Sequence, residues 1–393
     1  MSNPRVAKSR TEGNMLYQLP LAPRYAQLSD EELRRGIQKA KDRLGRRLVI
    51  LGHHYQQDDV IAFADFTGDS LKLAQLAAQQ KEAEFIVFCG VHFMAESADM
   101  LTTPAQQVIL PDLSAGCSMA DMADIDQAEA AWAFLTAHAG APLTPITYVN
   151  SSAAVKAFVG RQDGACCTSS NARTVVEWAL HGATPGRSDA GGHKILFLPD
   201  QHLGRNTAFS LGWPLDSMVV YDPHEPNGGL TPEQVRRAHF ILWKGHCSVH
   251  QLFTVEQVAA IRALDESYRI IVHPECPWAV CQQADLVGST EFIIQSVRDG
   301  EPGSHWAVGT EIHLVHRLAR SLPDRTVRLL AGIQCLCTTM YRIDLKHLYW
   351  VLERLLEGEV VNRITVDDET RRWSLIALER MLELQPSRPG AAR

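Results

Sequence analysis

The segment WKGHCSVH, residues 243 to 250, contains the residue pair most suggestive of metal chemistry. Cys247 and His250 lie three residues apart just after an apolar run, and a thiolate and an imidazole at this spacing resemble half of a zinc site. A complete zinc site needs about four ligands, usually as two close pairs. No Cys-x-x-Cys pair occurs in the sequence to supply the rest, so a buried thiol beside a polar histidine is a competing interpretation.

Single cysteines follow apolar runs at three separate places in the chain. They are Cys117 in LPDLSAGCSMADM, Cys247 in WKGHCSVH, and either Cys335 or Cys337 in LLAGIQCLCTTM. Thiolates supplied one at a time by separate elements can hold an iron–sulfur cluster, and three such ligands leave one iron of a four-iron cluster open. The pattern therefore favours a cluster site, without choosing between Cys335 and Cys337.

Hydroxyl side chains stand at three expected helix starts, as Ser70, Ser169 with Ser170, and Ser289 with Thr290. The simplest interpretation of each is helix capping, because a hydroxyl satisfies free backbone N–H groups there. Three helix N-termini directed at one centre would also form a strong anion site. A substrate with several carboxylates or a phosphate fits that expectation.

Polar side chains cluster where the apolar runs end. The group offers imidazole, phenol, amide and carboxylate functions, which are suited to proton transfer with a bound substrate. Its members are His53, Tyr55, Tyr148, Asn150, His250, His273 and Glu275.

The apolar runs that carry these side chains are short and separated by helical patterns. Runs such as RRLVILGHHY, FIVFCGV, PITYVN, KILFLPD, HFILWKG and RIIVHPE indicate buried strands of parallel sheets. Parallel sheets place ligand sites at the carboxyl ends of their strands, where the polar groups stand. The order of runs repeats three times, which predicts an α/β fold of three degenerate units with seams near residues 124–128 and 252–256.

Composition narrows the class of protein. The chain has 393 residues, 46% of them hydrophobic, and a formal net charge of -7, which argues against nucleic acid as a partner. No segment has the length of apolar residues needed for a membrane helix, and the N-terminus lacks the apolar core of a signal peptide. Nine scattered cysteines do not suit a secreted disulfide framework. We therefore expect a cytoplasmic protein without a membrane partner.

A series of short motifs runs in order from about residue 34 to 362 and includes GHHYQQDDVIAFADFTGDSLKLA, YVNSSAAVKA, CCTSSNA, PDQHLGRNTA, WKGHCSVH, VHPECPWAV, ADLVGST and VGTEIHLVHRL. This series resembles the motifs of the quinolinate synthases, the iron–sulfur enzymes of NAD biosynthesis. This resemblance implies three pseudo-threefold-related, three-layer α/β domains with short parallel sheets around a central active site. The implied domains are 1–125 with C-terminal helices from 343–393, then 126–252 and 253–342.

The resemblance also implies a cofactor and a reaction. One 4Fe-4S cluster per chain would be held by Cys117, Cys247 and Cys337, the last chosen because the family has a cysteine three residues before Met340. This transferase-type synthase would condense iminoaspartate with dihydroxyacetone phosphate to quinolinate, phosphate and water, with the open iron as Lewis acid. A functional coupling to an L-aspartate-oxidising enzyme is also implied.

Site roles follow from the same motifs. The implied catalytic residues are Tyr55, Glu275 and His273, with Tyr55 and Glu275 as proton-transfer groups. The implied substrate-binding residues are His53, Ser70, Tyr148, Asn150, Ser169, His250, His273, Glu275, Ser289 and Thr290.

Two alternatives remain beside the synthase. A zinc-binding regulatory or scaffold protein would use Cys247 and His250. A metal-free, aldolase-like α/β enzyme would need a Schiff-base lysine at a strand end, where Lys244 is the near candidate.

Overall fold

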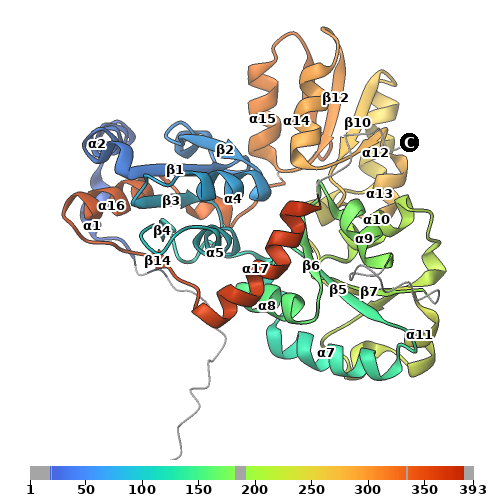
Figure 1. Ribbon diagram of the computed structural model, residues 1–393. Coiled ribbons are helices and arrows are strands. Elements are labelled where there is room, and N and C mark those ends of the chain that lie inside the picture. Colours follow the sequence, from blue (N-terminus) through green and yellow to red (C-terminus); the bar gives the residue numbers. More distant parts are fainter. Residues whose placement is uncertain (1–17, 19, 182–191, 333–334, 385–393) are drawn as a thin grey trace, which may run out of the picture.

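Three separate β-sheets, each flanked by helices, make up the chain in the computed structural model (Figure 1). The structure describes residues 18, 20–181, 192–332 and 335–384. The predicted α/β class with short, mostly parallel sheets is confirmed. Residues 1–17 of the predicted first domain and 385–393 of its C-terminal segment lie outside the described ranges. The exact domain boundaries stay a prediction.

The first sheet has the strand order β14-β4-β3-β1-β2. Four of its strands are parallel, while β14 returns from the C-terminal part of the chain and pairs antiparallel with β4. The bounds are β1 Leu48–His53, β2 Phe66–Gly68, β3 Phe85–Cys89, β4 Gln107–Ile109 and β14 Arg363–Ile364.

The other two sheets are entirely parallel. The second has the order β6-β5-β7-β9-β8, and the third has β11-β10-β12-β13. The bounds in the second are β5 Leu143–Tyr148, β6 Ala165–Cys167, β7 Lys194–Leu198, β8 Met218–Tyr221 and β9 Phe240–Trp243. Those in the third are β10 Tyr268–Val272, β11 Leu286–Val287, β12 His305–Gly309 and β13 Thr326–Leu329.

Helices join the parallel strands, since a parallel pair needs a crossover connection. In the three units, α4, α9 and α14 follow the edge strands β2, β6 and β11, while α5, α10 and α15 follow the central strands β3, β7 and β12. These helices are α4 Ser70–Gln79, α5 His92–Leu101, α9 Ala172–Leu180, α10 Gln201–Ser210, α14 Thr290–Asp299 and α15 Ile312–Ser321.

The remaining helices cover the sheets or connect the units. They are α1 Pro23–Gln27, α2 Asp30–Leu44, α3 Asp58–Ile61, α6 Ser118–Asp121, α7 Ile125–His138, α8 Ala153–Arg161, α11 Pro232–Arg237, α12 Val255–Leu264, α13 Trp278–Gln283, α16 Leu345–Leu356 and α17 Asp368–Glu383. Short 3-10 turns cover Gly45–Arg47, Leu215–Ser217, Pro226–Gly229, His250–Leu252 and Met340–Arg342. Helix α2 begins with a capping box formed by Ser29 and Glu32.

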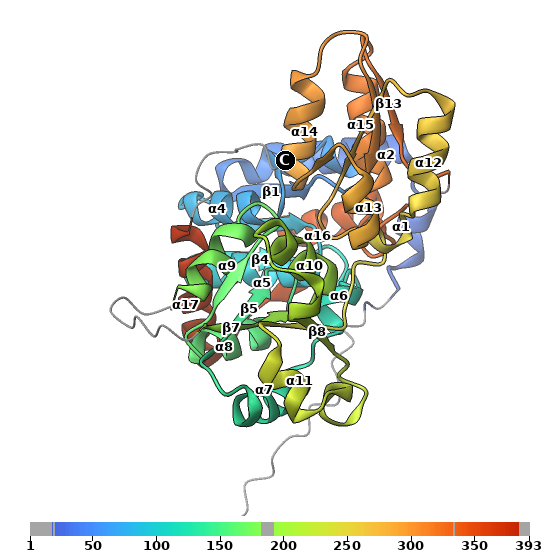
Figure 2. The same ribbon diagram turned by 90° about the vertical axis from the view of Figure 1, so that its right-hand side faces the viewer.

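Strands β1, β3, β7 and β9 are buried along their whole length, as continuous apolar runs predict for sheets covered on both faces. One apolar cluster is continuous through the first two sheets and includes side chains of α16 and α17. Two smaller clusters lie mainly around the third sheet. The third unit accordingly stands as a separate lobe above the other two (Figure 2).

The C-terminal segment contacts both of the first two units. Helix α16 packs against α2, whereas α17 lies along α8 and β6 of the second unit (Figure 1). The Ser374 hydroxyl donates to the Ala153 carbonyl at 2.8 Å, which fixes α17 at the start of α8. Within the described part of the chain, no helix is long and apolar enough to cross a membrane.

Candidate active site

A cavity lies where the three units meet. Its walls include strand-end turns and helix starts from all three sheets. Of the residues predicted for the site, the cavity is lined by His53, Tyr55, Ser70, Cys117, Tyr148, Asn150, Ser169, Cys247, His250, His273, Glu275, Thr290 and Cys337. Ser289 is buried beside this wall but does not line the cavity.

Two strand-end histidines are oriented by the same local turn. The backbone N–H of Tyr55 donates to Nδ1 of His53 at 3.1 Å, and the backbone N–H of Glu275 donates to Nδ1 of His273 at 3.4 Å. Because Nδ1 accepts in both rings, the ring proton lies on Nε2. Burial lowers the pKa of each of the two histidines to about 3, so both imidazoles are neutral at neutral pH.

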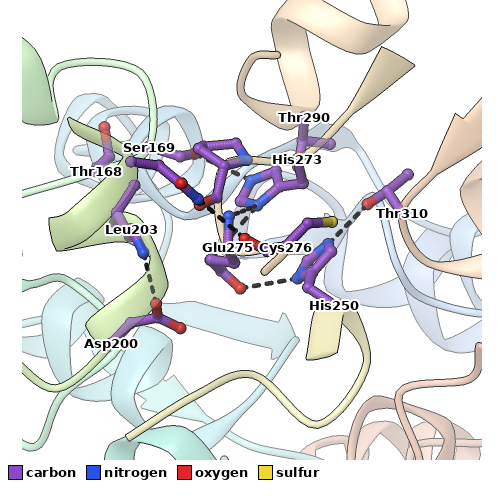
Figure 3. A network of polar contacts seen from close by, with 12 residues as sticks. Thr168, Ser169, Asp200, Leu203, His250, His273, Glu275, Cys276, Thr290 and Thr310 are labelled. Carbon is purple, nitrogen blue, oxygen red and sulfur yellow. Dashed lines mark hydrogen bonds and ion pairs between the residues drawn. The ribbon is translucent and has the colours of Figure 1, made fainter. Parts of the chain in front are cut away.

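A continuous chain of hydrogen bonds joins Tyr55 to Glu275. His250 lies 2.8 Å from Glu275 through Nδ1 and 3.0 Å from the Thr310 hydroxyl through Nε2 (Figure 3). The Thr310 hydroxyl is 2.8 Å from the Tyr55 phenol, which also lies 2.9 Å from the Thr290 hydroxyl. The two residues predicted to transfer protons are therefore connected through two intervening side chains.

Thr310 was not predicted as a site residue. It is fully buried and directly follows β12, so it stands at a strand end as the predicted polar residues do. The position after the apolar run HWAVG was the sequence signal that could have identified it.

Charge at the site is concentrated on Glu275. Burial opposes ionisation of this carboxyl, but the His273 and His250 imidazoles and hydrogen bonds from His250 and Tyr148 hold its pKa below the usual value. Burial and the nearby Glu275 charge raise the pKa of the Tyr55 and Tyr148 phenols well above 10. At neutral pH the cavity therefore presents the Glu275 carboxylate next to two protonated phenols.

The helix-start hydroxyls divide into two kinds. Ser289 caps α14 by accepting from the Phe292 N–H at 3.3 Å, as the capping interpretation predicts. Ser70 does not cap α4, because Asp69 accepts from the Lys72 N–H there. Ser70 and Thr290 line the cavity as the first residues of α4 and α14, where helix N-termini favour anions, and Ser169 lines it three residues before α9.

Three cysteines, one following each set of strands, enter the cavity from equivalent turns. Cys117, Cys247 and Cys337 each precede a helical turn. In each turn the backbone N–H three residues further on hydrogen-bonds to the sulfur, from Ala120, His250 and Met340 respectively. Among the described cysteines only these three line the cavity, and Cys335 does not.

The residues present fit an iron–sulfur cluster. Burial raises the pKa of all three thiols, that of Cys117 to about 12, so a bound cation is needed to hold them as thiolates. The thiols are unpaired and close enough to influence one another electrostatically. Three sulfur donors with N–H groups directed at them are a suitable ligand set for a cluster.

The zinc alternative has a geometric counterpart. Ligand atoms of Cys247, His250 and Glu275 lie within 4.8 Å of one another. Both ring nitrogens of His250 are already engaged, by Glu275 and Thr310. A metal bound to this imidazole would have to displace one of these contacts.

The aldolase alternative lacks its lysine. The Lys244 ammonium pairs with the Asp222 carboxylate at 2.6 Å and is half exposed, and this pairing raises its pKa. No lysine is among the described residues that line the cavity. A Schiff base therefore has no nucleophile at this site.

Taken together, the fold and cavity define an α/β enzyme with its site at the junction of three parallel sheets. The family model described as quinolinate synthetase A protein matches residues 35–383. The chain belongs to the quinolinate synthase family.

Individual relatives support the same assignment. The chain is 56% identical over 365 residues to a quinolinate synthase of Acidobacterium capsulatum, covering 92% of this chain and 95% of the relative. It is 57% identical over 358 residues to that of a Nocardioides species, covering 91% and 90%. The relative from Geobacillus thermodenitrificans is 55% identical over 364 residues, covering 92% and 95%.

Proposed function

We propose that this protein condenses iminoaspartate with dihydroxyacetone phosphate to form quinolinate, phosphate and water in NAD biosynthesis. The observation that carries the proposal is the convergence of Cys117, Cys247 and Cys337 on a cavity that is also lined by hydroxyls at, or shortly before, the N-termini of three helices. Family membership supports the product.

The helix starts would bind the negative groups of the substrates. Iminoaspartate has two carboxylates, and the second substrate has a phosphate. The N–H groups and hydroxyls at the starts of α4, α9 and α14 are donors for such anions, with Ser70, Ser169 and Thr290 as the side chains involved. The neutral His53 and His273 add Nε2–H donors; that of His273 lies 3.2 Å from the Ser169 hydroxyl.

Cys117, Cys247 and Cys337 would hold a 4Fe-4S cluster. With three protein ligands, one iron is left open and supplies Lewis-acid chemistry to substrate oxygen atoms. The N–H groups of Ala120 and Met340 at the sulfurs would stabilise the thiolates.

Glu275 and Tyr55 would move the protons. The Glu275 carboxylate is ionised at neutral pH, so it is free to accept a proton from a substrate carbon or nitrogen. The protonated Tyr55 phenol is suited to donate to a departing hydroxyl. The chain through Thr310 and His250 would let a proton return from Glu275 to Tyr55 between turnovers.

Quinolinate formation measured anaerobically tests this assignment. Tyr55→Phe and Glu275→Gln should each lower kcat by about 100-fold, the order of a positioned acid or base, with iron content unchanged. Tyr341→Phe is a matched control, because that ring is half exposed and outside the cavity. Wild-type rates in both site variants would refute the assigned roles.

We also propose that the protein acts in the cytoplasm next to an L-aspartate-oxidising enzyme. The described cysteines are all free, as a reducing compartment requires. An imine hydrolyses in water, so a nearby source of iminoaspartate would limit its loss.

A further inference from the structure

Arg317 of α15 holds the turn that carries Tyr55. Its guanidinium donates to the His54 carbonyl at 2.9 Å and to the Gln56 carbonyl at 2.7 Å, and it pairs with Asp58 at 2.8 Å. The two carbonyls flank Tyr55 on both sides. Arg317 belongs to the third unit and Tyr55 to the first, so the contact crosses between units.

Asn206 of α10 holds the turn that carries Glu275 in the same manner. Its side-chain amide donates to the Pro274 carbonyl at 2.8 Å and to the Cys276 carbonyl at 2.9 Å. These two carbonyls lie on either side of Glu275 in sequence. The Asn206 amide donates to both of them, which uses its two hydrogens. Asn206 belongs to the second unit and the turn to the third.

Glu96 of α5 completes the series. Its carboxylate accepts from the Ala153 N–H at 3.0 Å, where α8 begins just after the turn with Tyr148 and Asn150. A carboxylate is favourable at this helix N-terminus. Glu96 belongs to the first unit and the turn to the second.

The three side chains occupy corresponding places. Helices α5, α10 and α15 each follow the strand that pairs with the first strand of their unit. Arg317 and Asn206 are the sixth residues of α15 and α10, and Glu96 is the fifth of α5. Contacts run from the first unit to the second, from the second to the third and from the third to the first, which closes a ring.

We propose that these residues form a ring of clamps between units, in which Arg317 positions Tyr55 and Asn206 positions Glu275. This inference rests on the proposed roles of Tyr55 and Glu275. The apolar core of the third unit is separate from the large cluster of the first two, and these polar contacts add to the packing that sets its position against them. A displacement of a catalytic group by about 1 Å can reduce the rate about 100-fold.

The kinetic test uses Arg317→Met and Asn206→Asp. Each should lower kcat by about 10- to 100-fold and change KM less, because the reacting groups are displaced rather than removed. Arg317→Lys should retain part of the kcat that Arg317→Met loses, because an ammonium can still donate to one of the two carbonyls. Arg320→Met is the control, since Arg320 lies on the same helix and also pairs with Asp58 but does not contact the carbonyls.

Double variants separate positioning from general stability. If Arg317 acts through the phenol, Arg317→Met should cost little once Tyr55 is Phe, and Asn206→Asp should cost little once Glu275 is Gln. If the loss of kcat in each double variant equals the product of the losses in its two single variants, the inference is overturned. If Asn206→Asp fails to fold, the comparison of Arg317→Met with and without Tyr55→Phe decides, because the Arg317 side chain is not fully buried, with 25% exposed.

Hydrogen exchange gives a readout independent of activity. Arg317→Met should speed amide exchange in residues 53–57 and leave 273–277 unchanged, while Asn206→Asp should do the reverse. Unchanged exchange in both turns, or equal acceleration throughout the chain, would overturn the inference. If Tyr55→Phe and Glu275→Gln lower the rate but the clamp variants do not, the clamps fail and the proposed function stands.

Discussion

The phenol oxygen of Tyr55 lies 2.8 Å from the hydroxyl oxygen of Thr310, although 255 residues separate them in sequence. The same hydroxyl is 3.0 Å from Nε2 of His250. A threonine at the end of one strand of the third sheet thus connects residues from turns that follow strands of the first and second sheets. The site exists only where the three units meet.

Replacement of Thr310 should impair catalysis more than stability. Thr310→Val keeps the shape but removes both hydrogen bonds, and it should lower kcat by about 10-fold or more, while Thr310→Ser should retain most of the rate. Steady-state assays of quinolinate check this, with Thr326→Val, an exposed residue of the same unit, as the control. Equal rates for Thr310→Val and wild type would contradict the hydrogen-bond chain.

Cys335 and Cys337 should behave differently despite their spacing. Cys337→Ala should lose bound iron and sulfide, whereas Cys335→Ala should keep both, because only Cys337 lines the cavity. Iron and sulfide analysis after anaerobic reconstitution distinguishes them. Iron loss in Cys335→Ala with retention in Cys337→Ala would reverse the ligand assignment.

Cys117→Ser separates the cluster from the zinc alternative. If three cysteines hold one cluster, this change should remove the visible absorption of the whole centre. A zinc ion on Cys247, His250 and Glu275 would survive it, since Cys117 is not in that group. One bound zinc per chain in Cys117→Ser, with no iron in the wild type, would favour the alternative.

Replacement of Ser70 should affect substrate binding, whereas replacement of Ser289 should affect stability. Ser70→Ala should raise KM by about 5-fold, equivalent to one lost hydrogen bond, with little change in stability because Asp69 caps α4. Ser289→Ala should lower the free energy of unfolding by about 1 kcal/mol, since it removes the α14 cap. Urea unfolding and steady-state kinetics on both variants test the pair; a stability loss confined to Ser70→Ala would contradict it.

Acid should destabilise the fold through His53 and His273. Their pKa is about 3 in the folded protein against an ordinary 6.5, so the unfolded chain binds more protons between these values. The free energy of unfolding should therefore rise from pH 3 to pH 6.5 and fall on acidification through the same window. The lowered pKa of Glu275 acts in the same direction.

Urea midpoints measured from pH 4 to 7 test this dependence. His53→Gln should make it shallower, while His224→Gln, at an exposed position, should not. A protein equally stable at pH 4 and pH 7 would contradict the neutral buried state of these imidazoles.

The sheets could be predicted because their strands are buried on both faces and are therefore continuous apolar runs between helical segments. The pairing of β14 with β4 could not be predicted. Strand β14 has only two residues, which is too short to show a periodicity, and its partner lies about 254 positions earlier in the sequence. The docking of α17 on α8 likewise depends on contacts between distant segments.

Site residues at strand ends could be predicted because parallel strands bring their carboxyl ends to one edge. Thr310 was not predicted as a site residue because a single hydroxyl after a strand resembles any capping residue. Its hydrogen-bond partners come from other units. The contrast between Ser70 and Ser289 depends on whether Asp69 or the serine itself accepts the helix N–H. Those details follow from backbone geometry that residue type does not specify.

The most direct test of the central claim is quinolinate formation by anaerobically reconstituted protein, measured together with its iron content before and after chelation. We predict about four irons and four sulfides per chain, as expected for one cysteine-ligated cluster, and quinolinate formation that disappears when the iron is removed. Iron-free, colourless protein that forms quinolinate at an undiminished rate would contradict the account.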